Sequence, residues 1–304
     1  MEYLLSICIP TYNRANLLAN TLTSIFNENE NNSDFEIVIS DNCSTDQTEF
    51  VVKKFLNINN NIKYIKQPSA IDGNSNIIFA LNNGTGKFLK LCNDTALFES
   101  GSIRILLNLI KVNENTKPVI FFSNISNSVE LIYEKTFNNF VRINSFLTTS
   151  ILAIGFWHTD FKNFEYLEDA FEYSLPALNL IRKNFKQKNN FLIYNNKIFS
   201  VQYVENKGGY NIIDVFVINY LCIILRKEYK NKNISFWTFE FEKIKVLTGF
   251  VAPWMKLLKK TNSGFTFSIK GANKKLFQVY YYNPLFYLMV IYFFFFDIIQ
   301  KLKR

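Results

Sequence analysis

The feature that most constrains the fold is an alternation of apolar strand-like runs and helical segments over the first 110 residues. Short apolar runs with β-branched residues predict strands, and apolar residues at helical spacing between them predict helices. The predicted strands lie at 3–10, 35–40, 62–65 and 88–92. The predicted helices lie at 15–28, from a Ser44/Gln47 capping box onward, and at 75–83. Such βαβ units predict an α/β fold with a mainly parallel, Rossmann-like sheet.

After about residue 115 the alternation is less regular. Strands are predicted at 118–125 and 147–154 and on both sides of Asn195-Asn196, with a helix at 165–183. From about 212 onward the chain reads as helices rich in lysine and aromatic residues. The sequence therefore predicts an α/β domain over 1–210 and a helical C-terminal region over 211–304.

Composition and charge narrow the class of protein. Of 304 residues, 48% are hydrophobic and 19% are charged, which is typical of a globular chain rather than a disordered one. The net charge is +9, yet no nucleic-acid-binding module is recognisable, so no nucleic-acid partner is expected. Lysine pairs gather after residue 180, which favours an anionic membrane surface, with scattered solvated lysines as the alternative.

The cysteines and the N-terminus indicate a compartment. Four widely spaced cysteines without a C-x-x-C motif are typical of reduced thiols. The first predicted strand begins within three residues of Met1, so no signal peptide is expected. We therefore expect the protein on the cytoplasmic side.

Polar residues collect at the carboxyl ends of three predicted strands, where open α/β sheets bind ligands. These clusters are 10–14, 41–46 and 93–95. Asp41 follows a buried strand and can accept hydrogen bonds from a base or ribose, whereas a plain turn and helix cap would not require it. Asp94, at the end of the fourth strand, is a natural Mg²⁺ or Mn²⁺ ligand, although one carboxylate alone makes a weak site.

Three runs in order and at matching spacing carry a family resemblance: S-I-C-I-P-T-Y-N-R (6–14), E-I-V-I-S-D-N-C-S-T-D (36–46) and T-G-K-F-L-K-L-C-N-D-T (85–95). The chain resembles the family 2 glycosyltransferases, and within them the branch that builds O-antigens and capsules, abequosyltransferase-like proteins among them. The resemblance is strong over 3–110 and looser over 110–205. It implies a GT-A fold with a nucleotide-binding half at 1–110 and an acceptor half at 111–210.

The resemblance also implies an activity: transfer of a sugar from a nucleotide-activated donor to a surface-polysaccharide acceptor, with inversion at the anomeric carbon. Thr11 and Tyr12 should flank the base, and Asp41 should accept from its N3–H. A hydrogen-bond acceptor at this position favours uracil or thymine, and hence a UDP-sugar or dTDP-sugar as the donor substrate. The donor-binding residues implied are Pro10, Thr11, Tyr12, Asn13, Arg14, Asp41, Asn42, Asp46, Asn76, Asn93 and Asp94.

The acidic motif departs from the family pattern, because Asn93-Asp94-Thr95 stands where relatives carry two or three aspartates. One interpretation is that Asp94 and the Thr95 hydroxyl hold a divalent Mn²⁺ or Mg²⁺ ion together with the donor diphosphate. Another is that the enzyme works without metal. A third is a degenerate, non-catalytic donor-binding or scaffold protein in polysaccharide assembly.

Inverting transfer needs a general base near the acceptor hydroxyl. The family often supplies it from an E-D pair, and Glu168-Asp169 is such a pair here, with Asp169 as the base. Asp160 and Glu165 are the other candidates, and a solvated acidic helix face is the structural alternative. The single histidine, His158, is more typical of a packed or surface residue.

The C-terminal run 276–296 contains no charged residue and is flanked by Lys274-Lys275 and by K-L-K-R at 301–304. It predicts a segment that dips into a membrane with aromatic and basic anchors. A membrane span and a core or dimer helix are the alternatives. Because acceptors in this branch are usually undecaprenyl-linked, the resemblance implies a protein peripheral to the inner face of the cell membrane, with a homodimer as a further option.

Overall fold

The computed structural model describes residues 3–27, 33–162, 175, 177–179, 181–182, 190–259 and 264–302. The chain divides into two compact units. Unit 1 comprises 1–135, 150–171 and 177–203, and unit 2 comprises 136–149, 172–176 and 204–304.

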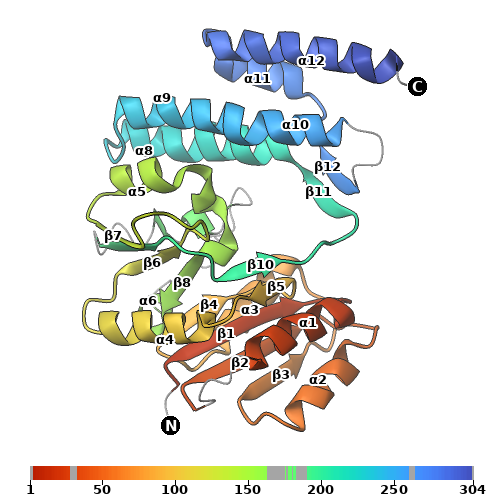
Figure 1. Ribbon diagram of the computed structural model, residues 1–304, viewed down its shortest axis with the longest axis vertical. Helices are drawn as coiled ribbons and strands as arrows, with labels where there is room; N and C mark the ends of the chain where they lie inside the picture. The colour runs from red at the N-terminus through yellow and green to blue at the C-terminus, as the bar shows by residue number, and fades with distance from the viewer. Residues whose placement is uncertain are drawn as a thin grey trace. The chain divides into compact units, whose positions relative to one another are not determined.

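Unit 1 is built on a sheet with the strand order β3-β2-β1-β4-β8-β6-β9-β7 (Figure 1). Its strands are β1 (Leu5–Thr11), β2 (Phe35–Asp41), β3 (Ile62–Lys66), β4 (Phe88–Leu91), β6 (Val119–Phe122), β7 (Leu131–Glu134), β8 (Ile154–Trp157) and β9 (Phe191–Tyr194). The first four strands are parallel, which confirms the predicted βαβ half. The other half is mixed, because β8 runs antiparallel to both β4 and β6.

Helices cover both faces of the parallel half. On one face, alternate residues of β1 and β2, such as Ile7 and Ile37, share a core with Leu18, Val52 and Ile103. These three come from α1 (Ala15–Phe26), α2 (Thr48–Leu56) and α4 (Ser102–Asn113). Helix α3 (Gly73–Asn82) contacts β1, β2 and β4 and lies on the other face, because side chains alternate along a strand. The predicted α/β class is therefore confirmed.

The strand predicted at 147–154 is wrong over most of its length. Short 3₁₀ turns occupy Ser145–Thr149 and Ile151–Ala153, and β8 begins only at Ile154. The hydroxyls of Thr148 and Thr149 donate to carbonyls three residues earlier, and such local bonds compete with strand pairing. The strands predicted around Asn195-Asn196 are confirmed, but they join different sheets: β9 pairs with β6, and β10 (Phe199–Val201) pairs with β5 (Ala96–Phe98).

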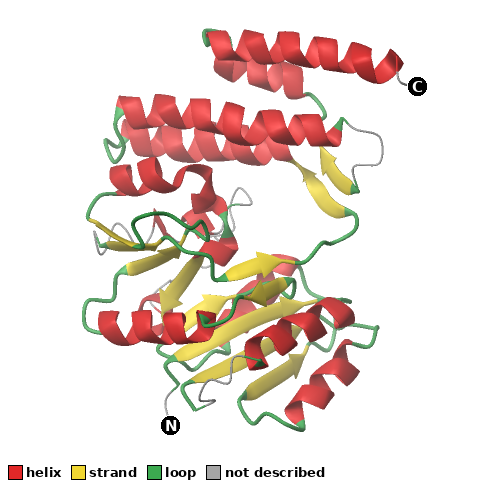
Figure 2. Cartoon of the chain, in the orientation of Figure 1, coloured by secondary structure: helices red, strands yellow, loops and turns green. Residues whose placement is uncertain are grey.

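Unit 2 is mainly helical (Figure 2). Its helices are α5 (Phe137–Asn144), π-helical turns over Asp214–Leu225, α8 (Arg226–Lys230), α9 (Phe236–Lys245), π-helical turns over Val246–Val251, α10 (Ala252–Leu258), α11 (Ala272–Tyr280) and α12 (Pro284–Leu302). The sequence pattern gave no sign of the two short parallel strands β11 (Lys207–Asn211) and β12 (Phe265–Ser268).

The C-terminal apolar run is not one helix. Helix α11 ends at Tyr280 and α12 begins at Pro284, where the Asn283 side chain accepts from the Leu285 N–H at 2.9 Å. Proline has no N–H to continue a preceding helix and is favoured at a helix start. Among the described residues, no helix combines the length and the apolar character needed to cross a membrane.

A lysine is buried inside the core of unit 1. Lys90 on β4 is 2% exposed, and its ammonium donates to the carbonyls of Leu91 and Leu152 at 3.1 and 2.5 Å. The rings of Phe122 and Phe199 lie 5.3 and 5.7 Å from the nitrogen. Burial lowers the pKa of Lys90 to about 8, because the charged form loses its hydration.

This burial predicts a pH-dependent stability. Between about pH 8 and the ordinary lysine pKa, the unfolded chain binds a proton at Lys90 that the folded chain has released. The free energy of unfolding therefore rises with pH in that window, with a slope approaching about 1.4 kcal/mol per pH unit, and this contribution is flat below it. Urea unfolding of the wild type and Lys90→Met from pH 7.5 to 10 isolates the contribution, because the variant lacks it. Parallel curves for the two proteins would contradict the assignment.

Candidate donor-binding site

Three loops meet where β1, β2 and β4 end. Thr11 and Asp41 are register partners at the ends of β1 and β2, and the Asn42 N–H donates to the Thr11 carbonyl at 2.9 Å. The Thr11 hydroxyl donates to Asp94 Oδ2 at 2.9 Å. The three clusters that the sequence indicated therefore lie together at the carboxyl edge of the parallel strands, where open α/β sheets bind ligands.

Asp94 is a buried charged group of this edge that is held by contacts from Thr11 and Arg14. Arg14 Nη1 donates to its Oδ1 at 2.9 Å, with the Asp94 side chain 3% exposed and the Arg14 side chain 44% exposed. The Thr21 hydroxyl donates to the Asp94 carbonyl at 2.9 Å. Burial raises the pKa of Asp94, and the charge of Arg14 and the hydrogen bonds from Arg14 and Thr11 offset only part of that rise.

The loop after β1 is fixed by the loop after β2. Asn13 adopts a positive φ of 51°, which asparagine tolerates better than most residues, and its N–H donates to the Ser44 hydroxyl at 2.9 Å. Its side-chain oxygen accepts from the Thr45 N–H at 2.8 Å. Ser44 therefore does not form the predicted capping box, and that prediction is wrong. The N-cap position of α2 belongs to Gln47.

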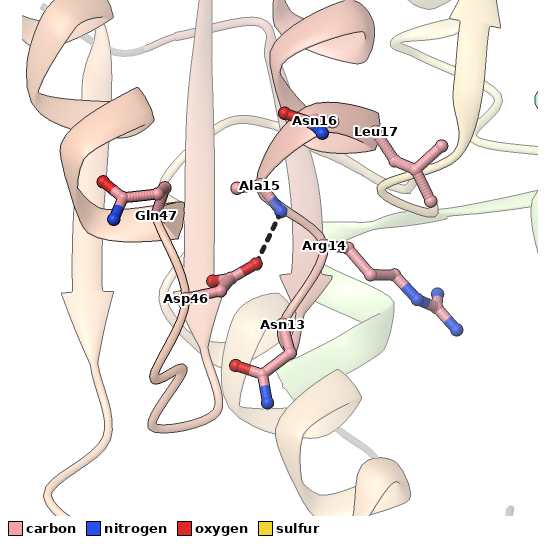
Figure 3. A pocket seen from close by; sticks show the side chains of 7 residues that line it. All are labelled: Asn13, Arg14, Ala15, Asn16, Leu17, Asp46 and Gln47. Carbon is pink, nitrogen blue, oxygen red and sulfur yellow. Dashed lines mark hydrogen bonds between the residues drawn. The ribbon is translucent and has the colours of Figure 1, made fainter.

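Asp46 joins the starts of two helices. One carboxylate oxygen accepts from the Ala15 N–H at 3.0 Å and the other from the Thr48 N–H at 3.0 Å, at the first residues of α1 and α2. Although partial burial acts to raise its pKa, hydrogen bonds from Thr48 and Ala15 lower the pKa of Asp46 overall. Beside it a shallow pocket of about 370 Å³ opens (Figure 3). The pocket is lined by Asn13, Arg14, Ala15, Asn16, Leu17, Asp46 and Gln47.

Besides Thr11 and Asp94, three other predicted donor-binding residues are buried, and their side chains hold the surrounding loops. Asp41 is fully buried and accepts from the Ser44 N–H at 2.8 Å and from the Tyr64 hydroxyl at 2.6 Å. Asn42 exchanges two 2.8 Å hydrogen bonds with the backbone of residue 71. Asn76 bonds both the hydroxyl and the carbonyl of Ser40, at 2.6 and 3.1 Å.

Other predicted donor residues are open to a ligand. Tyr12 is 50% exposed, Asn13 and Arg14 are exposed, and Pro10 and Asn93 are half-buried. The side chains that line the accessible part of this edge are therefore mainly those of the β1–α1 loop.

A resident divalent metal does not fit Asp94 in this arrangement. Both carboxylate oxygens already accept hydrogen bonds, one of them from a guanidinium, and the flanking Asn93 and Thr95 carry no charge. Within the described parts of the chain, no three His, Cys, Asp or Glu side chains are grouped so that they could hold a metal ion. A dication at Asp94 would have to displace Arg14 and would then lie beside a second cation.

The predicted general-base candidates Glu168 and Asp169 lie outside the described residues, as does Glu165. The other candidate, Asp160, is 8% exposed in the short helix α6 (His158–Lys162). His158 begins that helix, and its N–H donates to the Lys87 carbonyl at 2.9 Å.

Sequence reasoning missed Gln202, which fastens the Asn93-Asp94-Thr95 turn to α1. Its N–H donates to the Thr95 carbonyl at 2.8 Å. Its side-chain amide donates to the Leu17 carbonyl at 3.0 Å and the Thr21 hydroxyl at 3.3 Å. No local pattern marks this residue, because its partners are more than 100 positions away in the sequence.

Comparisons with known proteins agree with this geometry. The chain is 33% identical over 111 residues to the GalNAc(5)-diNAcBac-PP-undecaprenol beta-1,3-glucosyltransferase of Campylobacter jejuni, covering 36% of this chain and 35% of that protein. It is 52% identical over 54 residues to Abequosyltransferase RfbV of Salmonella typhimurium, covering 18% and 16%. The chain thus spans about a third or less of each of these relatives.

Among solved structures, the chain resembles S. aureus TarS 1-349 in complex with UDP, with a TM-score of 0.56 and 17% identity. The likeness covers 86% of this chain and 76% of that one, and it shows the fold alone. The family model for glycosyl transferase family 2 matches residues 6–172, which is more than half of the chain. The protein is therefore a member of glycosyl transferase family 2, with the GT-A fold that its three strand-end motifs predict.

Proposed function

We propose that the protein transfers a sugar from a nucleotide-activated donor to a polysaccharide or lipid-linked oligosaccharide acceptor. The observation that carries this proposal is the meeting of Thr11, Arg14 and Asp94 at the carboxyl edge of β1, β2 and β4, within the segment matched by the family model. Nucleotides bind at this edge of open α/β sheets. The Campylobacter jejuni relative, whose name gives an undecaprenol-linked substrate, supports a lipid-linked acceptor.

The donor is proposed to be of the UDP or dTDP type. Each carboxylate oxygen has two acceptor positions, so Asp41 can accept from a base N3–H in addition to the Ser44 N–H and the Tyr64 hydroxyl. Tyr12, half exposed next to Thr11, offers a ring for stacking against the base. The structure of TarS with UDP supports the nucleotide class.

The transfer is proposed to invert the anomeric carbon in one displacement. The acceptor oxygen forms a bond to the anomeric carbon while the bond from that carbon to the diphosphate oxygen breaks, and its electron pair leaves with the nucleoside diphosphate. The acceptor proton passes to a carboxylate, for which we propose Asp169 with Glu168 beside it. Residues 1–110 are proposed to bind the donor and 111–210 the acceptor.

Release of nucleoside diphosphate tests the proposal directly. Purified protein is incubated with UDP- and dTDP-sugars, with and without an undecaprenyl-diphosphate-linked oligosaccharide, and the free diphosphate is quantified. We expect slow release from one donor without acceptor and faster release with it. Binding of nucleotide with no release from any donor, with or without acceptor, would favour the non-catalytic scaffold instead.

Helix α12 is proposed to rest on an anionic membrane. Among the helix side chains that the structure describes, over 284–295, Phe286 and Phe293 are buried in unit 2, and most of the other apolar side chains are exposed. The exposed apolar side chains are Leu285, Tyr287, Leu288, Val290, Ile291, Tyr292, Phe294 and Phe295. At roughly 25 cal/mol per Å² of apolar area, burying this surface in lipid is favourable by several kcal/mol. The exposed Lys274 adds attraction to anionic headgroups, whereas Lys275 is paired with Asp214.

Charge substitution on this face tests the membrane proposal. The triple variant Leu288→Glu, Ile291→Glu and Phe295→Glu is expected to move the protein from the pellet to the supernatant in sedimentation with phosphatidylglycerol vesicles. The matched control places the same three glutamates at Ile58, Val112 and Val129, which are exposed in unit 1, and should still pellet. If the wild type stays in the supernatant and sediments as a dimer, α12 is an interface between two copies instead.

A further inference from the structure

The ion pair between Arg14 and Asp94 occupies the position of the family's acidic, metal-binding motif. Arg14 Nη1 lies 2.9 Å from Asp94 Oδ1, while Thr11 holds Oδ2 at the same distance. The Asp94 side chain is 3% exposed, whereas the Arg14 side chain is 44% exposed. Arg14 is one of the residues that line the pocket beside α1 (Figure 3). The charged side chains that line this pocket are Arg14 and Asp46, and Arg14 is the cation of the two.

The residues around the pair leave that positive charge available. Asn93 and Thr95 are neutral on both sides of Asp94, and the carboxylate of Asp46 is occupied by the Ala15 and Thr48 N–H groups. Arg14 also stands at the N-cap of the 12-residue helix α1, whose N-terminal end favours an anion. A planar guanidinium carries five N–H donors in a fork that matches phosphate oxygens.

We propose that Arg14 takes the place of the divalent metal and binds the donor diphosphate, and that Asp94 positions its guanidinium. This inference rests on the proposed function and deepens it. When the bond between the anomeric carbon and the diphosphate oxygen breaks, negative charge grows on the departing diphosphate. Arg14 stabilises that charge and keeps its own proton, because a guanidinium is not deprotonated in proteins.

Calorimetric titration with UDP and dTDP, once with Mn²⁺ and once with EDTA, tests the inference without relying on turnover. For the wild type we expect the same dissociation constant in both buffers. Arg14→Ala should bind about tenfold more weakly in EDTA, the loss typical of a hydrogen-bonded charge contact. Arg14→Lys should retain part of the affinity because the charge is kept. Arg104→Ala, at an exposed arginine of α4 that does not line this pocket, is the matched control and should bind as the wild type does.

The outcomes separate this inference from the proposed function. Wild-type binding that tightens more than about fivefold with Mn²⁺ and is lost in EDTA overturns the role of Arg14 while leaving a nucleotide site in place. Unchanged affinity of Arg14→Ala, with a thermal unfolding midpoint equal to that of the wild type, also overturns it. No binding of either nucleotide in either buffer overturns the proposed function, and this inference with it.

Discussion

Replacement of Asp94 by asparagine is expected to lower nucleoside-diphosphate release roughly 100-fold, the scale of losing one positioned electrostatic group. Asparagine keeps an oxygen for the Thr11 hydroxyl but removes the charge that holds Arg14. The guanidinium would then be free to adopt other rotamers, and its alignment with the diphosphate would be lost. Steady-state release with the best donor of the panel measures the effect.

The stability of the same variant separates a positioning role from a structural one. Because burial raises the pKa of Asp94, its charged form is already costly in this site. Asp94→Asn should therefore unfold close to the wild-type midpoint. Asp34→Asn, which removes an exposed pair with Lys111, is the matched control and should retain full release. Wild-type release from Asp94→Asn would place the chemistry elsewhere.

Asp41→Ala is expected to remove detectable UDP binding and also to destabilise unit 1. The carboxylate is fully buried, and its loss leaves the Tyr64 hydroxyl and the Ser44 N–H without their acceptor. Each unsatisfied buried donor costs about 1–3 kcal/mol. Urea unfolding measures the destabilisation, and calorimetry at a temperature where the variant is folded measures the binding.

Tyr64→Phe is the matched control for this variant. It removes the same 2.6 Å hydrogen bond but leaves the Asp41 carboxylate and the Ser44 contact in place. We expect a loss of about 1 kcal/mol in unfolding free energy with UDP affinity close to that of the wild type. If Tyr64→Phe loses as much affinity as Asp41→Ala, then Asp41 acts by shaping the loop and not by accepting from the base.

Local pattern was sufficient to predict the parallel half of the sheet and the meeting of the three strand-end motifs at one edge. The strands ending at Thr11, Asp41 and Leu91 are apolar runs with polar residues directly after them, and short helical links require them to be parallel. Parallel strands bring their carboxyl ends to one edge, so the three motifs had to meet. Each of these features depends on residues that are close in sequence, and local pattern therefore predicts it.

Local pattern failed where a polar side chain can hydrogen-bond to more than one partner. The hydroxyls of Thr148 and Thr149 bond the backbone three residues earlier, and β8 enters the sheet late and antiparallel. Ser44 was predicted as a helix cap, but the Asn13 N–H from another loop claims its hydroxyl. A polar side chain near a helix start has the same local sequence pattern whether it caps that helix or bonds to another loop.

The α/β class, the edge of the sheet at which the donor is expected to bind, and the family all follow from the amino-acid sequence, because each depends on periodicity and on motifs in order. The contacts of Asp94 follow only from the folded chain. Its ion-pair partner Arg14 lies 80 positions before it, and Gln202, which bonds the neighbouring Thr95 carbonyl, lies more than 100 positions after it. Neither contact follows from sequence spacing. A carboxylate at a strand end can bind a metal ion or a guanidinium. Here the β1–α1 loop places the guanidinium of Arg14 beside Asp94.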